Sequence, residues 1–109
     1  MKLIVALIRP ERFGPVKKAL EEKGYVGMTL TDVKGRGAQK GIVLEYRGGR
    51  LNIDVLVKVR IEIVVHDRDT EDLVQTIRES AWTGANGDGR IFVLPAEQAI
   101  QIRTGEKEG

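Results

Sequence analysis

Apolar residues recur along the chain with a period of two in some segments and of three to four in others. Lys2–Ile8 is a nearly continuous apolar run that ends at Arg9, and it predicts a buried strand. Val55–Val65 has valine or isoleucine at every odd position from 57 to 65, with Lys58, Arg60 and Glu62 between them. This alternation predicts the strongest strand of the chain. Three weaker runs predict further strands over Tyr25–Gly35, Arg90–Leu94 and Ala96–Ile102.

The period of three to four predicts two helices. Within Glu11–Lys23 the apolar residues fall on one helical face, and Gly24 is placed to end this helix in the left-handed conformation. The segment Asp67–Thr70 offers capping side chains for a second helix. The apolar face of this second helix is formed by Leu73, Val74, Ile77 and Ala81.

The order of these elements matches the ferredoxin-like βαββαβ arrangement of the α+β class, as one domain over residues 1–109. Two helices then cover one face of an antiparallel sheet. The opposite face is expected to carry side chains that alternate along Val55–Val65. Apolar side chains that the helices leave uncovered need another subunit, so we expect an oligomer.

The stretch of about Arg36–Asn52 shows no period of its own, which predicts a long loop. Loops beyond about 12–15 residues are uncommon in compact domains and are usually functional or disordered. Between Lys34 and Arg50, five basic residues and five glycines accompany a single acid, Glu45, although the formal net charge of the chain is only +2. This composition predicts a mobile loop for an anionic ligand or partner, with a plain solvated loop as the alternative.

Composition excludes several classes of function. The chain has no cysteine and one histidine, His66, which excludes disulfides, thiolate catalysis and Cys-based metal sites and leaves no Ser-His-acid set. No pair of carboxylates can be recognised in the sequence as a general acid and base, so we do not expect the protein to be an enzyme. The five aromatic residues fall in no RNA-binding pattern, which argues against a nucleic-acid module. The apolar start is interrupted by Arg9-Pro10, so we expect neither a signal peptide nor a membrane span, and a soluble cytoplasmic protein.

The segment Thr83–Arg90, TGANGDGR, holds three glycines in eight residues. It follows a predicted helix and leads into a strand, so it does not fit a P-loop, which leads into a helix. Gly84 can end the helix before an Asp-Gly turn that needs no ligand. Alternatively, the backbone amides of this segment, together with Arg90, form a concavity that binds an anion.

Five segments resemble the PII nitrogen-regulatory signal-transduction proteins, and the resemblance covers essentially the whole chain. They are TLTDVKGRGAQKG (29–41), EYRG (45–48), KVRIEIVV (58–65), TGANGDGRIFVLP (83–95) and IRTGE (102–106). The resemblance implies a homotrimer of ferredoxin-like subunits with nucleotide sites in the clefts between them. It also implies a T-loop over about 36–54, a second nucleotide loop over about 83–90 and a C-terminal segment over about 96–109.

The same resemblance implies ligands and residues. ATP or ADP would be bound by Thr29, Gly37, Ala38, Gln39, Val64, Gly87, Asp88, Gly89 and Arg90, and by Gln101 and Arg103 of a neighbouring subunit. 2-Oxoglutarate, bound with Mg-ATP, would meet Gly37, Gln39, Lys40, Gly41 and Lys58, with Gln39 as a Mg²⁺ ligand. The T-loop would dock on a target such as an ammonium transporter, with Arg47 inserted, or on a soluble enzyme or regulator of nitrogen metabolism.

The chain departs from the family pattern at several positions. Leu51 replaces a tyrosine that is modified in many members and Gly49 replaces a serine phosphorylated in some, so control by modification there is not expected. Ala38 and Gln101 stand where arginines are common, and each lost charge-assisted bond weakens phosphate binding by about 1.5–3 kcal/mol. Val57 stands where proline is frequent. A slow ATPase is the remaining alternative, with negligible turnover expected.

Overall fold

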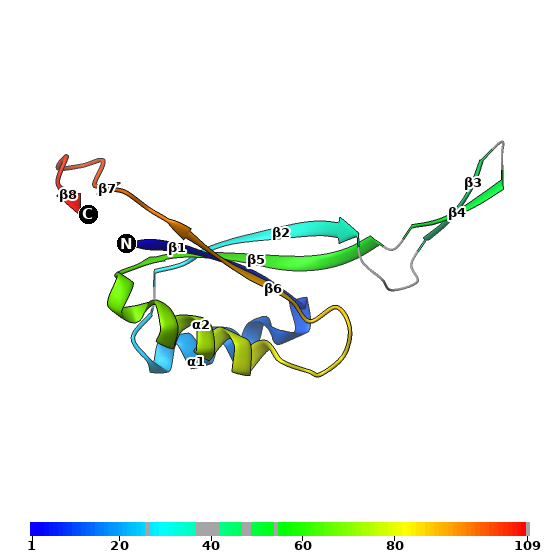
Figure 1. Ribbon diagram of the computed structural model, residues 1–109, viewed down its shortest axis with the longest axis horizontal. Coiled ribbons are helices and arrows are strands. Elements are labelled where there is room, and N and C mark those ends of the chain that lie inside the picture. The colour runs from blue at the N-terminus through cyan, green and yellow to red at the C-terminus, as the bar shows by residue number, and fades with distance from the viewer. Residues whose placement is uncertain (26, 37–41, 47–48, 54, 109) are drawn as a thin grey trace.

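The computed structural model describes the backbone of residues 1–25, 27–36, 42–46, 49–53 and 55–108, and the side chains of these residues outside 33–57 (Figure 1). The elements follow the predicted order, with two additional small strand pairs. They are β1 (Lys2–Ile8), the 3-10 turn η1 (Pro10–Arg12), α1 (Phe13–Glu22), β2 (Thr29–Arg36), β3 (Ile42–Tyr46), β4 (Gly49–Ile53), β5 (Val55–Val65), α2 (Asp67–Ala81), β6 (Gly89–Pro95), β7 (Ala99–Ile100) and β8 (Lys107–Glu108).

The main sheet has the strand order β2-β5-β1-β6, and its neighbouring strands are antiparallel. Both helices pack on the same face of this sheet (Figure 1). The expected ferredoxin-like α+β fold is therefore confirmed. Gly24, with φ of 87°, follows α1 in the left-handed conformation, as predicted.

The core lies between the sheet and the two helices. Residues directly opposite each other on neighbouring strands share a face, so Ile4 on β1 and its partner Ile63 on β5 point the same way. Both are buried, as are Leu73 and Ile77 of α2. Full burial of one such aliphatic side chain stabilises the fold by about 1.5–3 kcal/mol.

The apolar side of β5 corrects one expectation. Val59, Ile61, Ile63 and Val65 were expected on the sheet face away from the helices, but they are buried beneath the helices. The physical reason is that this stripe faces Ile4, Ala6 and Ile8 of β1, whose apolar side also needs cover. These residues of β5 therefore give no argument for a second subunit.

A different set of apolar residues occupies the face away from the helices, called here the open face. The central strand β1 contributes Leu3, Val5 and Leu7, and their register partners include Val64, Phe92 and Leu94. Val64, Phe92 and Leu94 remain 48%, 45% and 42% exposed. The apolar surface that needs cover is thus formed by these residues of the open face and not by the buried stripe Val59, Ile61, Ile63 and Val65 of β5.

The segment Arg36–Asn52 is not an irregular loop throughout. Ile42–Tyr46 and Gly49–Ile53 pair as the antiparallel strands β3 and β4, with Ile42 opposite Ile53 and Tyr46 opposite Gly49. The prediction failed because glycines and charged residues interrupt the alternation on which it relied. The β-branched and aromatic residues of IVLEY nevertheless favour a strand once a partner strand lies beside it.

Two further predictions are corrected at element ends. The strand predicted over Ala96–Ile102 covers only Ala99–Ile100, and it pairs with a further strand at Lys107–Glu108. A turn stabilised by a hydrogen bond from the Gly105 amide to the Gln101 carbonyl brings these strands together. Helix α2 receives no side-chain cap from its N-cap residue His66, and Asp67 instead forms an ion pair with the amino group of Met1 at 3.2 Å.

Candidate functional site

The segment Thr83–Asp88 forms a loop that leads from α2 into β6, and the carboxylate of Asp88 is its centre. Oδ2 of Asp88 accepts hydrogen bonds from the amides of Thr83 and Gly84, both at 2.9 Å. Oδ1 accepts from the Thr83 hydroxyl and from Nε of Arg9 at 3.0 Å. The hydroxyl and amide of Thr83, followed by Arg9 and the Gly84 amide, hold the pKa of Asp88 well below its usual range.

Two cations reach the same loop from neighbouring strands. Arg9 follows β1, and its Nη2 donates to the carbonyl oxygen of Asn86 at 2.5 Å. Lys58 of β5 donates to the carbonyl oxygen of Gly87. Partial burial and the positive charge of Arg9 lower the pKa of Lys58, whereas the carboxylates of Asp88 and Glu11 act in the opposite direction. An anion bound beside Lys58 would therefore stabilise its charged form.

Gly87 and Gly89, where the loop meets β6, have backbone conformations that favour glycine. Gly87 has φ of 91° and Gly89 has φ of 113°, a backbone region that residues with a Cβ rarely adopt. A Cβ on Gly89 would in addition overlap the carbonyl oxygen of Leu7 in β1. The loop therefore enters β6 in direct contact with the backbone of β1.

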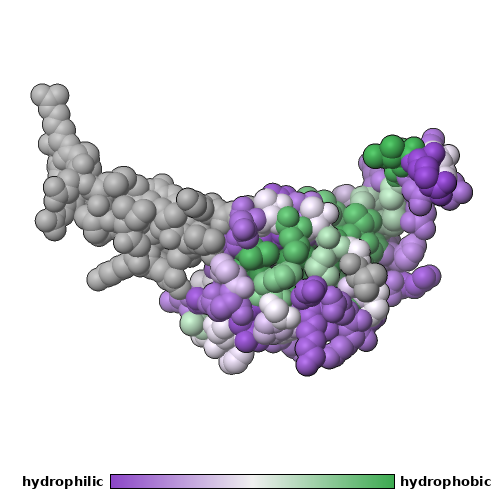
Figure 2. Space-filling view, turned by 180° about the vertical axis from the view of Figure 1, so that it is seen from behind, coloured by the Kyte–Doolittle hydropathy of each residue, from purple (hydrophilic) through white to green (hydrophobic). Residues whose placement is uncertain are grey.

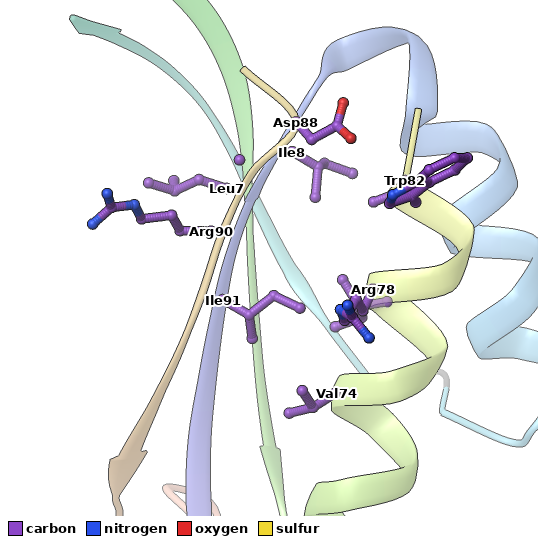
Figure 3. Close-up of a pocket in the computed structure, with 11 residues that line it drawn as sticks. Leu7, Ile8, Val74, Arg78, Trp82, Asp88, Arg90 and Ile91 are labelled. Atoms are coloured by element: carbon purple, nitrogen blue, oxygen red, sulfur yellow. The ribbon is translucent and has the colours of Figure 1, made fainter. Parts of the chain in front are cut away.

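A cleft of about 360 Å³ lies between α2 and β6, beside this loop (Figure 3). Its apolar lining includes Val74 of α2 and Ile91 of β6, and Trp82 and Arg78 lie along the helix. Figure 3 shows Ile91 pointing toward α2, whereas Arg90 points to the other side of β6. Of the predicted nucleotide residues that the structure describes, only Asp88, Gly89 and Arg90 line this cleft. It therefore does not gather the predicted nucleotide site.

The open face brings together several predicted residues that are distant in sequence. Thr29 of β2 lies opposite Glu62 of β5, and alternation along β5 places Lys58 and Val64 on the same face as Glu62. Arg90 lies opposite Leu7 and shares this face as well. The fold thus places Thr29, Lys58, Val64 and Arg90 on one side of the sheet, with the loop 83–88 at its end.

Two of the predicted residues that the structure describes are not brought to this place within one chain. Gln101 and Arg103 belong to the segment Ala99–Glu108, called here the C-terminal projection, which contains β7 and β8 and lies at the end of the main sheet away from the loop 83–88 (Figure 1). The carboxamide oxygen of Gln101 accepts a hydrogen bond from the Thr104 hydroxyl at 2.8 Å, so it is engaged within its own turn. Gly37, Ala38, Gln39, Lys40, Gly41 and Arg47 lie outside the described residues.

The C-terminal projection also carries apolar side chains that its own chain leaves uncovered. Ile100 is 55% exposed and Ile102 is fully exposed. Figure 2 shows a hydrophobic group on this projection, apart from the hydrophobic surface at the middle of the body. Both surfaces are suited to burial against another molecule.

Arg9 is a functional candidate that was not predicted from the sequence, where it marked the end of a strand and was given no role in the site. The register pairs Ile8 with Gly89, so the next residue along β1 must approach Asp88. An assumed antiparallel pairing of the first and last long strands would therefore have predicted this contact.

Two features are absent from the described part of the chain. Within it, no three His, Asp or Glu side chains gather in a way that could hold a metal ion. The described helices include none with the length and apolar character needed to cross a membrane.

Comparison with known proteins gives a consistent result over nearly the whole chain. Residues 1–106 match the family model described as Nitrogen regulatory protein P-II. Nitrogen regulatory protein P-II 2 of Methanothermobacter thermautotrophicus is 54% identical over 106 residues, which cover 97% of this chain and 92% of the relative. Nitrogen regulatory protein P-II of Azospirillum brasilense is 48% identical over 109 residues, 100% of this chain and 97% of the relative. Nitrogen regulatory protein GlnK2 of Haloferax mediterranei is 45% identical over 97% of this chain and 86% of its own.

Proposed function

The chain belongs to the nitrogen regulatory protein P-II family, and from that premise we propose that it is a non-enzymatic sensor of ATP and ADP. The observation that carries the proposal is the glycine-containing loop 83–88, which precedes Arg90. The cations Arg9 and Lys58 and the carboxylate of Asp88 form hydrogen bonds that hold this loop. Phosphates need fixed positive charge and close approach of the backbone. Lys58, Arg90 and the glycines of this loop supply both.

The proposed nucleotide site is shared between subunits of a homotrimer. Two observations support this arrangement. The open face exposes the apolar residues Val64, Phe92 and Leu94, which a second and third copy would cover. Arg103 lies between β7 and β8 in sequence, and this C-terminal projection is at the end of the main sheet away from the loop 83–88 (Figure 1), so a neighbouring subunit would have to supply Arg103 to the phosphates.

The proposal extends to a second effector and to a target. Lys58 would bind a carboxylate of 2-oxoglutarate, and its lowered pKa is consistent with a place for an added anion. Gln39 would complete the site as a ligand of Mg²⁺ held with ATP, with Gly37, Lys40 and Gly41 beside it. Ligand-dependent conformations of residues 36–54, with Arg47 near the tip, would then regulate an ammonium transporter from the cytoplasm.

Calorimetric titration with ATP, ADP and 2-oxoglutarate, with and without Mg²⁺, tests this function. Arg90→Gln is expected to weaken ATP binding by about 10- to 150-fold, the equivalent of 1.5–3 kcal/mol for a charge-assisted bond. Arg78→Gln removes an exposed arginine on the helical side of the sheet and is the matched control, with unchanged affinity. Absence of nucleotide binding at millimolar concentration would overturn the sensor proposal. Binding of ATP without 2-oxoglutarate would remove only the second effector.

Two alternatives keep the fold but change the role. A soluble enzyme or regulator of nitrogen metabolism could be the target, and capture experiments with and without ATP separate it from a transporter. If an ammonium transporter is recovered only in the absence of ATP, the result supports the transporter as the target. A slow ATPase would release phosphate, and sustained turnover of bound ATP would contradict a non-enzymatic role.

A further inference from the structure

Asp88 occupies an unusual position for a residue next to a phosphate site. Both of its carboxylate oxygens are engaged by groups of the protein, which are the amides of Thr83 and Gly84, the Thr83 hydroxyl and Nε of Arg9. A carboxylate repels phosphate unless its charge is neutralised. Here Arg9 lies at 3.0 Å, and the side chains of Arg9 and Asp88 are only 18% and 25% exposed.

Arg9 joins two points of the loop with one planar group. Its Nε donates to the side chain of Asp88 while its Nη2 donates to the main-chain carbonyl of Asn86. A guanidinium presents these donors in a fixed fork, which the single ammonium of lysine does not. We call the set Arg9, Thr83, Gly84, Asn86 and Asp88 the Arg9–Asp88 clasp.

We propose that Arg9 and Asp88 are positioning residues, which hold the loop 83–88 in its anion-binding form without contacting the bound nucleotide themselves. This inference rests on the proposed nucleotide function and assigns a different role to Asp88 than direct contact with the ligand. The clasp ties the start of the loop, at Thr83 and Gly84, to its end at Asp88. The loop is then ordered before the ligand arrives, so binding does not have to order it.

The surrounding contacts make Arg9 the group that fixes the clasp to the sheet. Arg9 follows β1 directly, and β1 pairs with β6 through Ile8 and Gly89. Its other carboxylate neighbour, Glu11, lies 3.8 Å from Nη1 and is 66% exposed. Glu11 is outside the clasp and provides a matched control for loss of an acid beside the same arginine.

The test compares Arg9→Met, Arg9→Lys, Asp88→Asn and Glu11→Gln in the full chain. Two readouts are used: ATP affinity by calorimetry, and hydrogen exchange of the Thr83 and Gly84 amides by NMR in nucleotide-free protein. Arg9→Met and Asp88→Asn are each expected to weaken ATP binding at least tenfold and to speed exchange of both amides at least tenfold. The double variant should be little worse than either single one, because both remove the same clasp. Arg9→Lys should be intermediate and Glu11→Gln should match the wild type.

Three results would contradict the clasp. Protected Thr83 and Gly84 amides in Arg9→Met would overturn it, and so would unchanged ATP affinity in that variant. Weakened ATP binding in Asp88→Asn with both amides still protected would mean that Asp88 contacts the ligand. If Arg9→Met does not fold, Arg9→Lys decides by the same two readouts. If the wild type binds no nucleotide, the proposed function fails, while the exchange measurement still tests whether the clasp orders the loop.

Discussion

Replacing Gly89 with alanine is the sharpest test of how the loop joins the sheet. Gly89 has φ of 113°, and an added Cβ would overlap the carbonyl oxygen of Leu7 in the central strand β1. The backbone conformation alone costs about 1–3 kcal/mol for a residue with a Cβ. Forcing a methyl group into packed structure costs about 1–3 kcal/mol more. We therefore expect Gly89→Ala to lower the free energy of unfolding by about 4 kcal/mol.

Two other glycines separate these contributions. Gly105 has φ of 72°, but a Cβ there would have no neighbour within 4 Å, so Gly105→Ala should cost about 1–2 kcal/mol, from backbone strain alone. Gly24 has φ of 87° and likewise no Cβ neighbour within 4 Å, so Gly24→Ala should cost a similar amount, about 1–2 kcal/mol.

Urea unfolding followed by circular dichroism, at one protein concentration for all variants, measures these differences. Equal slopes against urea show that stability alone has changed. A loss for Gly89→Ala no larger than that for Gly105→Ala would refute the reasoning. It would mean that β1 and β6 separate easily enough to admit a methyl group.

Three further predictions concern charge and assembly. Because the pKa of Asp88 is lowered by folding, its contribution to stability is present above about pH 4, its ordinary value in an unfolded chain, and is lost as pH falls toward the folded pKa. The difference in unfolding free energy between wild type and Asp88→Asn should therefore stay constant from neutral pH down to about pH 5 and shrink below about pH 4. Burial, followed by the hydrogen bond to Asp72, raises the pKa of Tyr25 to about 12, so Asp72→Asn should lower it only part of the way toward 10 in an ultraviolet titration. Phe92→Glu on the open face should reduce the mass measured by light scattering below that of a trimer, whereas Gln75→Glu on α2 should not, and an unchanged mass for Phe92→Glu would count against the proposed interface.

The sequence predicts the framework of this fold well because burial controls it. The alternation along Val55–Val65 and the three-to-four spacing of α1 and α2 reflect which side chains face the core. The strands β3 and β4 were not predicted, because their segment is rich in glycine and charged residues and shows no such alternation. The side of the sheet on which the apolar residues of β5 lie was predicted wrongly for another reason. Alternation shows that the two faces of a strand differ, but it does not show which face packs against the helices.

The candidate site was predicted less completely, since it depends on which strands lie side by side. TGANGDGR could be recognised as a glycine-rich segment, but its position beside Arg9 and Lys58 follows from the pairing of β6 with β1 and of β1 with β5. The role of Asp88 in holding the loop is a matter of hydrogen-bond geometry, which residue spacing does not contain. Gln101 likewise gave no local signal that its side chain would bond to Thr104.

The pairing of β5 has a mechanical consequence. β5 is continuous over 11 residues, about 36 Å at the usual rise of a strand. β1 holds it on one side only from Val59 to Val65, whereas Val55 to Lys58 pair with β2 alone. Strand β5 therefore projects beyond the edge of β1, and Lys58 is the first residue of the projecting part. A small rotation of the backbone at Lys58 displaces Val55 more than Val57, because the displacement grows with distance from the part of β5 that β1 supports.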